Sequence, residues 1–318
     1  RNILYFCTNS SKRNGSMKFI YYLVFACWYL LSLLPLRVLY VISDILFFPL
    51  FYCIKYRRPI VYKNLSSSFP EKTEAEIKKI EKNFYHFFCD YVVETIKLFS
   101  ISKKQIMRRI TFGGLEQVRS DLERENKKYC FLYLGHYCNW EYVASLQYWL
   151  PEIHCGQIYH PLYNKAFDRL FLKLRGQFGG DNIPMKEALR HILKLGQGDK
   201  KVMIGFIADQ APSWQAMEHW TTFLNHETAF FLGAERMGQK LDAAVYYADI
   251  KRVKRGYYHV EVKPLTLHPK ELPQYRLTDM YIANLERQIR EAPAYWLWSH
   301  NRWKRTKQEW LTGSWKWW

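Results

Sequence analysis

The sequence predicts an α/β fold, in which a mixed central sheet is flanked by helices and N-terminal helices anchor the chain to a membrane. Two observations predict this class. After about residue 73, short apolar runs alternate with segments whose apolar residues recur every three or four positions, which indicates strands alternating with helices. Such alternation is typical of a sheet covered on both faces. Before it, residues 19–54 carry only Arg37 and Asp44 as charged side chains.

The N-terminal part divides into two predicted segments. Residues 1–16 are polar and irregular and are expected to be a disordered region or an extension, whereas residues 17–60 are expected to form a membrane-anchoring helical segment. The run 19–36 contains eighteen uncharged residues, close to the ~20 that a spanning helix needs. Basic residues flank the region, so a span, a shallow helical hairpin and one anchor with an interfacial second helix all remain open. We expect attachment without assigning a topology.

The α/β domain is predicted to cover residues 61–318 and to begin with a helix over 73–100. Thr73 followed by Glu76 is typical of a capping box at its start. Short apolar runs predict strands over 129–134, 155–159, 202–208, 243–250 and 257–262, the last two as a hairpin. Helical periodicity predicts helices over 140–149, 164–178, 185–195, 229–238 and 278–291.

The most informative residues are His136 and Glu141, directly after the strand at 129–134. A separation of five residues does not put two side chains on one helix face, so they meet only if the chain turns between them. Asn139 is a plausible N-cap for a helix from Trp140, which leaves His136 on the preceding loop. The carboxyl ends of strands in open α/β sheets bind ligands. The alternative is two unconnected surface residues; the pattern favours a base and its orienter.

Three other positions are candidates for chemistry. Asp209 follows the strand at 202–208, where its simpler role is to cap a turn, and Arg175 precedes a glycine-rich turn, where such a residue is usually a solvated helix-end charge. Cys138 lies inside the His136 loop, but a role as nucleophile is disfavoured because no basic partner other than His136 is near in sequence. Residues 296–304 alternate aromatic and basic side chains, a pattern that suggests a role.

Composition limits the partners. Lys and Arg number 47 against 29 Asp and Glu, so the net charge of +18 favours a polyanionic partner such as nucleic acid, a phosphorylated molecule or an anionic membrane. Aromatic residues, 18% of the chain, concentrate with basic ones near the two ends rather than along a sheet face, which disfavours nucleic acid. The seven cysteines lack paired spacing, which is typical of reduced thiols in a cytosol-facing protein. Without metal-binding or nucleotide-binding motifs, we expect neither metal nor cofactor.

The motif Gly135-His136-x-x-Asn139-Trp140-Glu141 resembles the H-x4-D/E signature of the lysophospholipid acyltransferase superfamily. More narrowly, the chain is similar to the lipid A late acyltransferases of Gram-negative bacteria, the lauroyl and myristoyl acyltransferases. The resemblance runs from the N-terminal apolar region through Asp209-Gln210 and residues 220–225 to Trp298-x-His300-x-Arg302-Trp303-Lys304. It therefore covers nearly the whole chain from Met17.

This resemblance implies an acyltransferase domain over 61–318 that uses no cofactor. It implies acyl carrier protein as the thioester donor and a phosphorylated glycolipid, the lipid A precursor, as acceptor. The enzyme would work on the anionic cytoplasmic face of the inner membrane. His136 and Glu141 match the catalytic dyad, with His136 as general base and Glu141 holding its other ring nitrogen; Arg175, Asp209 and Asn139 are expected to bind substrate.

The acceptor leaves one alternative open. Glycerol-phosphate acyltransferases usually carry Asp where this chain has Glu141, and they have an EGTR-type phosphate-binding block that is missing here. A glycerophospholipid acceptor is therefore disfavoured. An acyltransferase of the same superfamily that acts on an aminolipid or another glycolipid remains the alternative.

Overall fold

The computed structural model describes residues 22, 24–162 and 164–314, and it confirms the predicted α/β class. Its centre is a seven-stranded sheet in the order β1-β9-β8-β2-β5-β3-β4. The strands are β1 (Ile110–Gly113), β2 (Tyr129–Leu134), β3 (His154–Tyr159), β4 (Asp181–Pro184), β5 (Val202–Ile207), β8 (Ala244–Lys254) and β9 (Tyr257–Thr266). Neighbouring strands run parallel except β8 and β9, which form the predicted hairpin. The sheet is therefore mixed, as expected.

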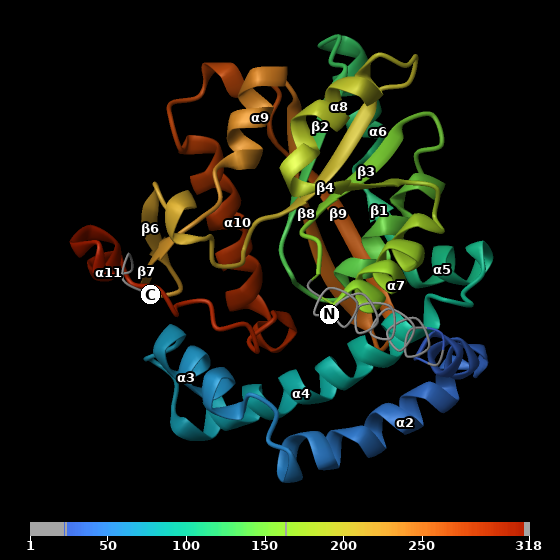
Figure 1. The fold of residues 1–318 in the computed structure, drawn as a ribbon, viewed down its shortest axis with the longest axis vertical. Helices are drawn as coiled ribbons and strands as arrows, with labels where there is room; N and C mark the ends of the chain where they lie inside the picture. Colours follow the sequence, from blue (N-terminus) through green and yellow to red (C-terminus); the bar gives the residue numbers. More distant parts are fainter. Residues whose placement is uncertain (1–21, 23, 163, 315–318) are drawn as a thin grey trace, which may run out of the picture.

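Helices cover the sheet and close one of its ends (Figure 1). They are α4 (Glu74–Lys97), α5 (Lys103–Arg109), α6 (Leu115–Arg124), α7 (Lys165–Gly176), α8 (Ala188–Gly196), α9 (Gly233–Leu241) and α10 (Arg276–Glu291), whereas α11 (Lys307–Thr312) lies away from the sheet. Because both faces of the sheet are covered, its central strands β2 and β5 are continuous apolar runs rather than alternating ones. A separate hairpin, β6 (Trp220–Phe223) with β7 (His226–Ala229), stands beside α10.

Several predicted elements are confirmed and one start is wrong. The strand at 129–134 has the predicted bounds, and Thr73 and Glu76 form the predicted capping box of α4. The helix predicted from residue 229 begins instead at Gly233, because Ala229 ends β7. The segment after residue 139 is a run of 3-10 turns, Trp140–Tyr148, rather than an α-helix. This tighter winding changes where its side chains point.

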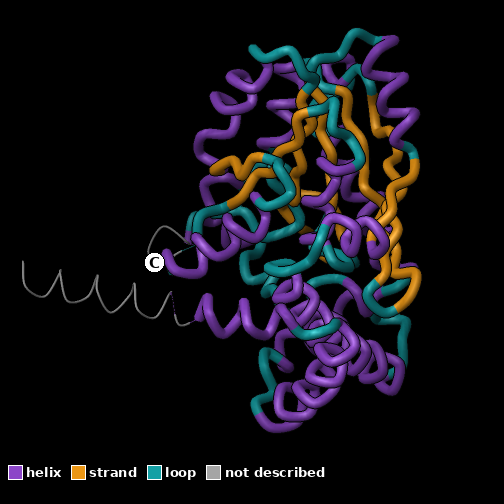
Figure 2. The backbone as a smooth tube through the Cα atoms, turned by 90° about the vertical axis from the view of Figure 1, so that its right-hand side faces the viewer, coloured by secondary structure: helices purple, strands orange, loops and turns teal. Residues whose placement is uncertain are grey.

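The N-terminal region packs on the domain as a helical layer (Figure 2). After a helical segment, Val24–Leu33, α2 (Leu36–Phe48) continues through a π-helical turn (Pro49–Cys53) to α3 (Arg58–Ser68). The stretch Leu36–Cys53 is, by length and composition, apolar enough to cross a membrane, yet it packs along α4. The predicted extension 1–16 lies outside the described residues, and the predicted boundary at residue 60 falls inside α3.

Candidate active site

His136 lies where two neighbouring parallel strands end. In the β2–β5 ladder Leu134 pairs with Ile207, so residues two positions beyond each strand, His136 and Asp209, come together. The ring nitrogen Nδ1 of His136 lies 2.6 Å from Asp209 Oδ1, and the backbone N–H of His136 donates to Oδ2 at 2.9 Å. The register of the sheet therefore builds a His–Asp pair from segments 73 residues apart.

Gly135 makes room for this arrangement. A Cβ at residue 135 would lie 2.5 Å from Cδ1 of Leu285, a distance that side chains do not tolerate. The glycine thus lets α10 approach the end of β2 closely. The approach is also fastened by the Tyr281 hydroxyl of α10, which donates to the Leu134 carbonyl at 3.1 Å.

Asp209 is a buried carboxylate with three hydrogen-bond donors. Besides the two donors of His136, the indole N–H of Trp296 donates to Oδ2 at 2.8 Å. Burial alone would raise the pKa of Asp209, but the charge and hydrogen bonds of His136, together with the Trp296 bond, lower it to about 2. Asp209 is therefore ionised near neutral pH and can only accept hydrogen bonds. His136 Nδ1 must then carry a proton, so the neutral form of the ring has its lone pair on Nε2.

The other ring nitrogen of His136, Nε2, makes no contact with Asp209. It lies 3.3 Å from Nε2 of Gln210, whose amide donates to the lone pair. The ring packs edge-on against Trp140, with centroids 5.0 Å apart, and the side chain stays 18% exposed. A hydroxyl could thus take the place of Gln210 on this nitrogen.

Glu141 does not hold His136, which corrects the expected dyad. Its carboxylate is buried and forms a two-pronged ion pair with Arg175, with Nε to Oε2 at 2.7 Å and Nη2 to Oε1 at 2.6 Å. The flat guanidinium matches the carboxylate geometry, so both oxygens of Glu141 accept hydrogen bonds from Arg175 at the end of α7. Burial on its own would lower the pKa of Arg175. The charge and hydrogen bonds of Glu141 outweigh burial and raise the pKa above its ordinary value, so Arg175 stays charged.

Two other residues of the motif, Asn139 and Cys138, are buried in the protein interior. Asn139 occupies the predicted N-cap position, but it is fully buried and its side chain makes no capping bond. Its Nδ2 donates instead to Glu94 Oε2 at 2.7 Å. Cys138 is also fully buried, and burial raises the pKa of its thiol well above the usual value. Its thiol is therefore protonated, as the argument against a nucleophile expects.

The C-terminal cluster contributes site residues that motif reasoning left without a role. Residue 296 bridges to Tyr137 in antiparallel fashion, and the N–H of Leu297 donates to the His136 carbonyl at 3.1 Å. Further on, His300 Nε2 accepts from the N–H of Ala211 at 3.2 Å, and burial lowers the pKa of His300 to about 4. Alternating aromatic and basic residues signalled this segment, but only the fold shows that Trp296 reaches Asp209.

The larger described cavity is elsewhere. A cavity of about 740 Å³ is lined by His154 and Asp181, the first residues of β3 and β4, and by His191 of α8. This is the amino end of the parallel strands, opposite the end where ligands bind in such sheets. Within the described parts of the chain, no group of three or more His, Cys, Asp or Glu could hold a metal ion.

Comparison with known proteins shows the family of the chain. No curated protein matches the chain. A family model, bacterial lipid A biosynthesis acyltransferase, matches residues 7–305 and so takes in His136, Glu141, Arg175, Asp209 and all of the aromatic and basic segment 296–304. The activity of this membrane-associated family is acyl transfer in lipid A biosynthesis. The chain therefore belongs to the bacterial lipid A biosynthesis acyltransferase family.

Proposed function

We propose that the protein moves a fatty acyl chain from an acyl carrier protein thioester to a hydroxyl of a phosphorylated lipid A precursor at the cytoplasmic face of the inner membrane. The observation that carries the reaction chemistry is the 2.6 Å contact between His136 Nδ1 and Asp209 Oδ1, with Nε2 left on the accessible side. The family match supports the acceptor class. The net charge of +18 suits an anionic lipid and an acidic carrier protein.

In the proposed reaction, His136 Nε2 takes the proton of the acceptor hydroxyl as its oxygen attacks the thioester carbonyl. General-base assistance of this kind is worth roughly 10²–10⁴ in rate. Asp209 holds the ring in the productive tautomer and stabilises the imidazolium that forms. When the tetrahedral intermediate collapses, the carbon–sulfur bond breaks and Nε2 returns the proton to the departing thiol.

Arg175 and Glu141 act one step away from the proton transfer. Trp140 joins the two parts of the site, because its ring packs on His136 while its indole N–H lies 3.2 Å from Glu141 Oε1. We assign Glu141 the task of orienting Arg175, whose charge then stabilises the negative oxygen of the tetrahedral intermediate. A fixed cation at such a position contributes more than it would in water. Glu141 is thus a positioning residue in this proposal.

The base is tested by comparing two histidines. His136→Gln should lower turnover of lauroyl or myristoyl acyl carrier protein with a lipid A precursor by at least about 100-fold. His154→Gln is a matched control, because His154 is also paired with an aspartate, Asp181 at 3.0 Å, but lies at the opposite end of the sheet. Near-normal turnover in folded His136→Gln protein would exclude His136 as the base.

The substrates are tested separately, by mass spectrometry of the acylated product. The wild-type enzyme is given acyl carrier protein or coenzyme A thioesters, and a lipid A precursor or phosphatidylethanolamine as acceptor. Transfer is expected from the carrier-protein thioester to the lipid A precursor. Preferential acylation of phosphatidylethanolamine would favour the aminolipid alternative, and preference for coenzyme A would reject the proposed donor.

A further inference from the structure

Helix α2 presents an apolar stripe to the outside of the molecule. Val38, Val41, Ile45 and Phe48 of α2, and Tyr52 of the π-helical turn that continues it, follow one another at intervals of three and four residues, which places them on one side. Val41, Ile45 and Phe48 are 57%, 63% and 62% exposed. A continuous stripe of this kind marks an interaction site rather than ordinary protein surface.

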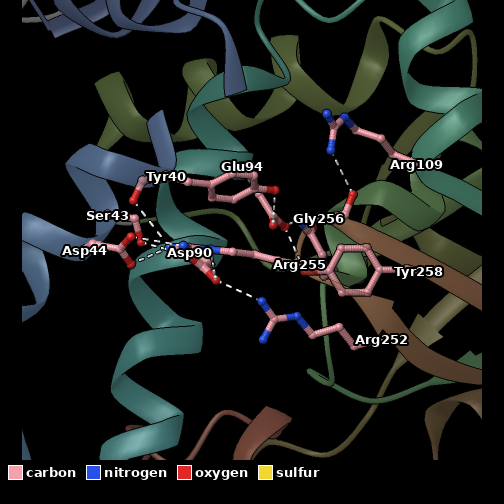
Figure 3. A network of polar contacts seen from close by, with 11 residues as sticks. Tyr40, Ser43, Asp44, Asp90, Glu94, Arg109, Arg252, Arg255, Gly256 and Tyr258 are labelled. Atoms are coloured by element: carbon pink, nitrogen blue, oxygen red, sulfur yellow. Dashed lines mark hydrogen bonds and ion pairs between the residues drawn. The ribbon is translucent and has the colours of Figure 1, made fainter. Parts of the chain in front are cut away.

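The other side of α2 is bound to the domain by apolar and polar contacts. Leu39 and Phe47 are buried there. The Tyr40 hydroxyl donates to Glu94 Oε1, and the Ser43 hydroxyl donates to Asp90 Oδ1, both at 2.8 Å. Figure 3 shows these side chains of α2 and α4 meeting in one polar network. Helix α2 is thus a fixed part of the domain, with one side on protein and the other uncovered.

The same network binds the β8–β9 turn to the middle of α2 (Figure 3). Arg255 donates from Nη2 to Asp44 Oδ1 at 2.6 Å and from Nη1 to Asp44 Oδ2 at 3.0 Å, and it also pairs with Asp90 at 2.6 Å. Arg252 of the same hairpin reaches Asp90 at 2.9 Å. Arg255 of the turn therefore lies against the centre of α2, while Arg252 holds the same hairpin to the adjacent α4 through Asp90.

This arrangement is incompatible with α2 crossing a bilayer. Asp44 lies at the midpoint of the apolar stretch Leu36–Cys53, so a perpendicular helix would carry the Asp44–Arg255 pair and the hairpin turn to the hydrocarbon centre. Charged side chains and irregular backbone are strongly disfavoured there. A helix with one apolar side and one polar, protein-bound side is suited to lying in the interface plane.

The charges beside the stripe suit anionic lipid. The hairpin turn exposes Lys251, Lys254 and, between them, Val253 at 66% exposure. Lys55 follows the far end of the stripe and is exposed as well. Cations next to an embedded apolar side attract acidic headgroups.

We propose that α2 lies flat in the surface of an anionic bilayer, with the stripe Val38–Tyr52 between headgroups and acyl chains and the β8–β9 turn on the headgroups. This goes beyond the proposed reaction, because it concerns how the folded domain meets the membrane and holds for any acceptor. Of the three topologies left open by the sequence, a span, a shallow hairpin and an interfacial helix, the proposal assigns the interfacial helix to α2.

The orientation is tested by labelling the two ends of α2. Arg37→Cys and Lys55→Cys are made one at a time in a full-length chain whose Cys7, Cys27 and Cys53 are changed to Ser. Each is treated with a membrane-impermeant maleimide in inside-out and right-side-out inner-membrane vesicles. Both positions should label only in inside-out vesicles. Labelling of the two positions from opposite sides would overturn the proposal.

The lipid contact is tested by flotation with vesicles of phosphatidylglycerol and phosphatidylethanolamine. The double variant Ile45→Asp/Phe48→Asp should bind these vesicles at least tenfold less than the wild type. The matched control is Leu193→Asp, which changes a 42% exposed leucine on α8 and should bind normally. Lys251→Glu/Lys254→Glu should weaken binding to these vesicles but not to phosphatidylcholine alone. Unchanged flotation of Ile45→Asp/Phe48→Asp, with normal turnover in detergent as the folding check, would refute the docking face.

Discussion

At the scale of single residues, the site is organised around the hydrogen bonds that the buried carboxylate of Asp209 accepts. Oδ2 accepts from the His136 backbone N–H and the Trp296 indole, while Oδ1 accepts from the His136 ring. A buried carboxylate is tolerated only when such donors replace its water. The same three bonds fix the tautomer of His136, so one aspartate provides both local stability and a base with its lone pair outward.

The variant Asp209→Asn separates charge from shape. The asparagine oxygen would remain where Oδ2 receives two donors, so its amide nitrogen would face His136 Nδ1. The ring must then accept at Nδ1 and carry its proton on Nε2, which removes the lone pair that the alcohol needs. We expect kcat to fall roughly 10²–10⁴-fold, with little change in KM. Steady-state kinetics decide this, and a loss confined to KM would assign Asp209 to substrate binding instead.

For Glu141 and Arg175 we expect non-additive effects on stability, because each residue neutralises the charge of the other. Removing one partner of a buried pair leaves an uncompensated charge, which costs about 3 kcal/mol of unfolding free energy. Glu141→Gln and Arg175→Gln should each destabilise strongly, and the double variant should lose much less than their sum. Urea unfolding of the three proteins measures this coupling. Additive losses would contradict the pair seen here.

At the scale of elements, the sequence is most informative where a strand is long and central. The bounds of β2 are predictable because it is an uninterrupted apolar run. The β8–β9 hairpin is predicted in the right place, but both strands continue past their predicted ends at residues 250 and 262, to Lys254 and Thr266, through sequence that carries charged side chains. The edge strands β1 and β4 have four residues each, too few for periodicity to register. The His136–Asp209 contact depends on which strands are neighbours, and no local pattern contains that register. Glu141 was chosen as partner because it is near in sequence, whereas the 3-10 turns direct it to Arg175.

The loop around His300 predicts how stability depends on pH. His300 must be neutral to accept the Ala211 N–H, and burial lowers its pKa to about 4 from the usual 6.5. Between these two values the unfolded chain binds more protons than the folded one, so stability falls as pH decreases from about 6.5 to 4. The loss is on the order of 2 kcal/mol. The lowered pKa of Asp209 acts in the same direction, but only below its ordinary value of 3.8.

Unfolding in detergent at pH 7 and pH 5 measures the effect of His300. The variant His300→Asn keeps an acceptor that does not titrate, and it should reduce the difference in stability between the two pH values. An unchanged difference would place the acid sensitivity in other groups.

At the scale of the whole molecule, the two ends of the chain support one another at the site. Asn64 of α3 donates from Nδ2 to the carbonyls of Trp298 and His300, both at 2.9 Å, and Arg57 donates to the Ser299 carbonyl at 3.0 Å. These contacts hold the segment whose Trp296 in turn holds Asp209. A cut at residue 60 would therefore divide α3, the helix whose Asn64 supports the segment of residues 296–300, called here the catalytic loop because the proposed site depends on it.

Asn64→Ala tests whether this long-range support reaches the chemistry. The change leaves two carbonyls of residues 298 and 300 without their donor, in a buried setting, and it should cost about 2 kcal/mol of unfolding free energy. Because the loop that carries Trp296 loosens, kcat should fall several-fold even at temperatures where the protein stays folded. Asn64→Asp should be worse, since a carboxylate would face both carbonyl oxygens. Asn301→Ala, at an exposed neighbouring position, is the control and should change neither quantity. If Asn64→Ala lowered stability while kcat stayed at the wild-type value, α3 would support the fold alone, and the catalytic loop would hold its geometry without the N-terminal helices.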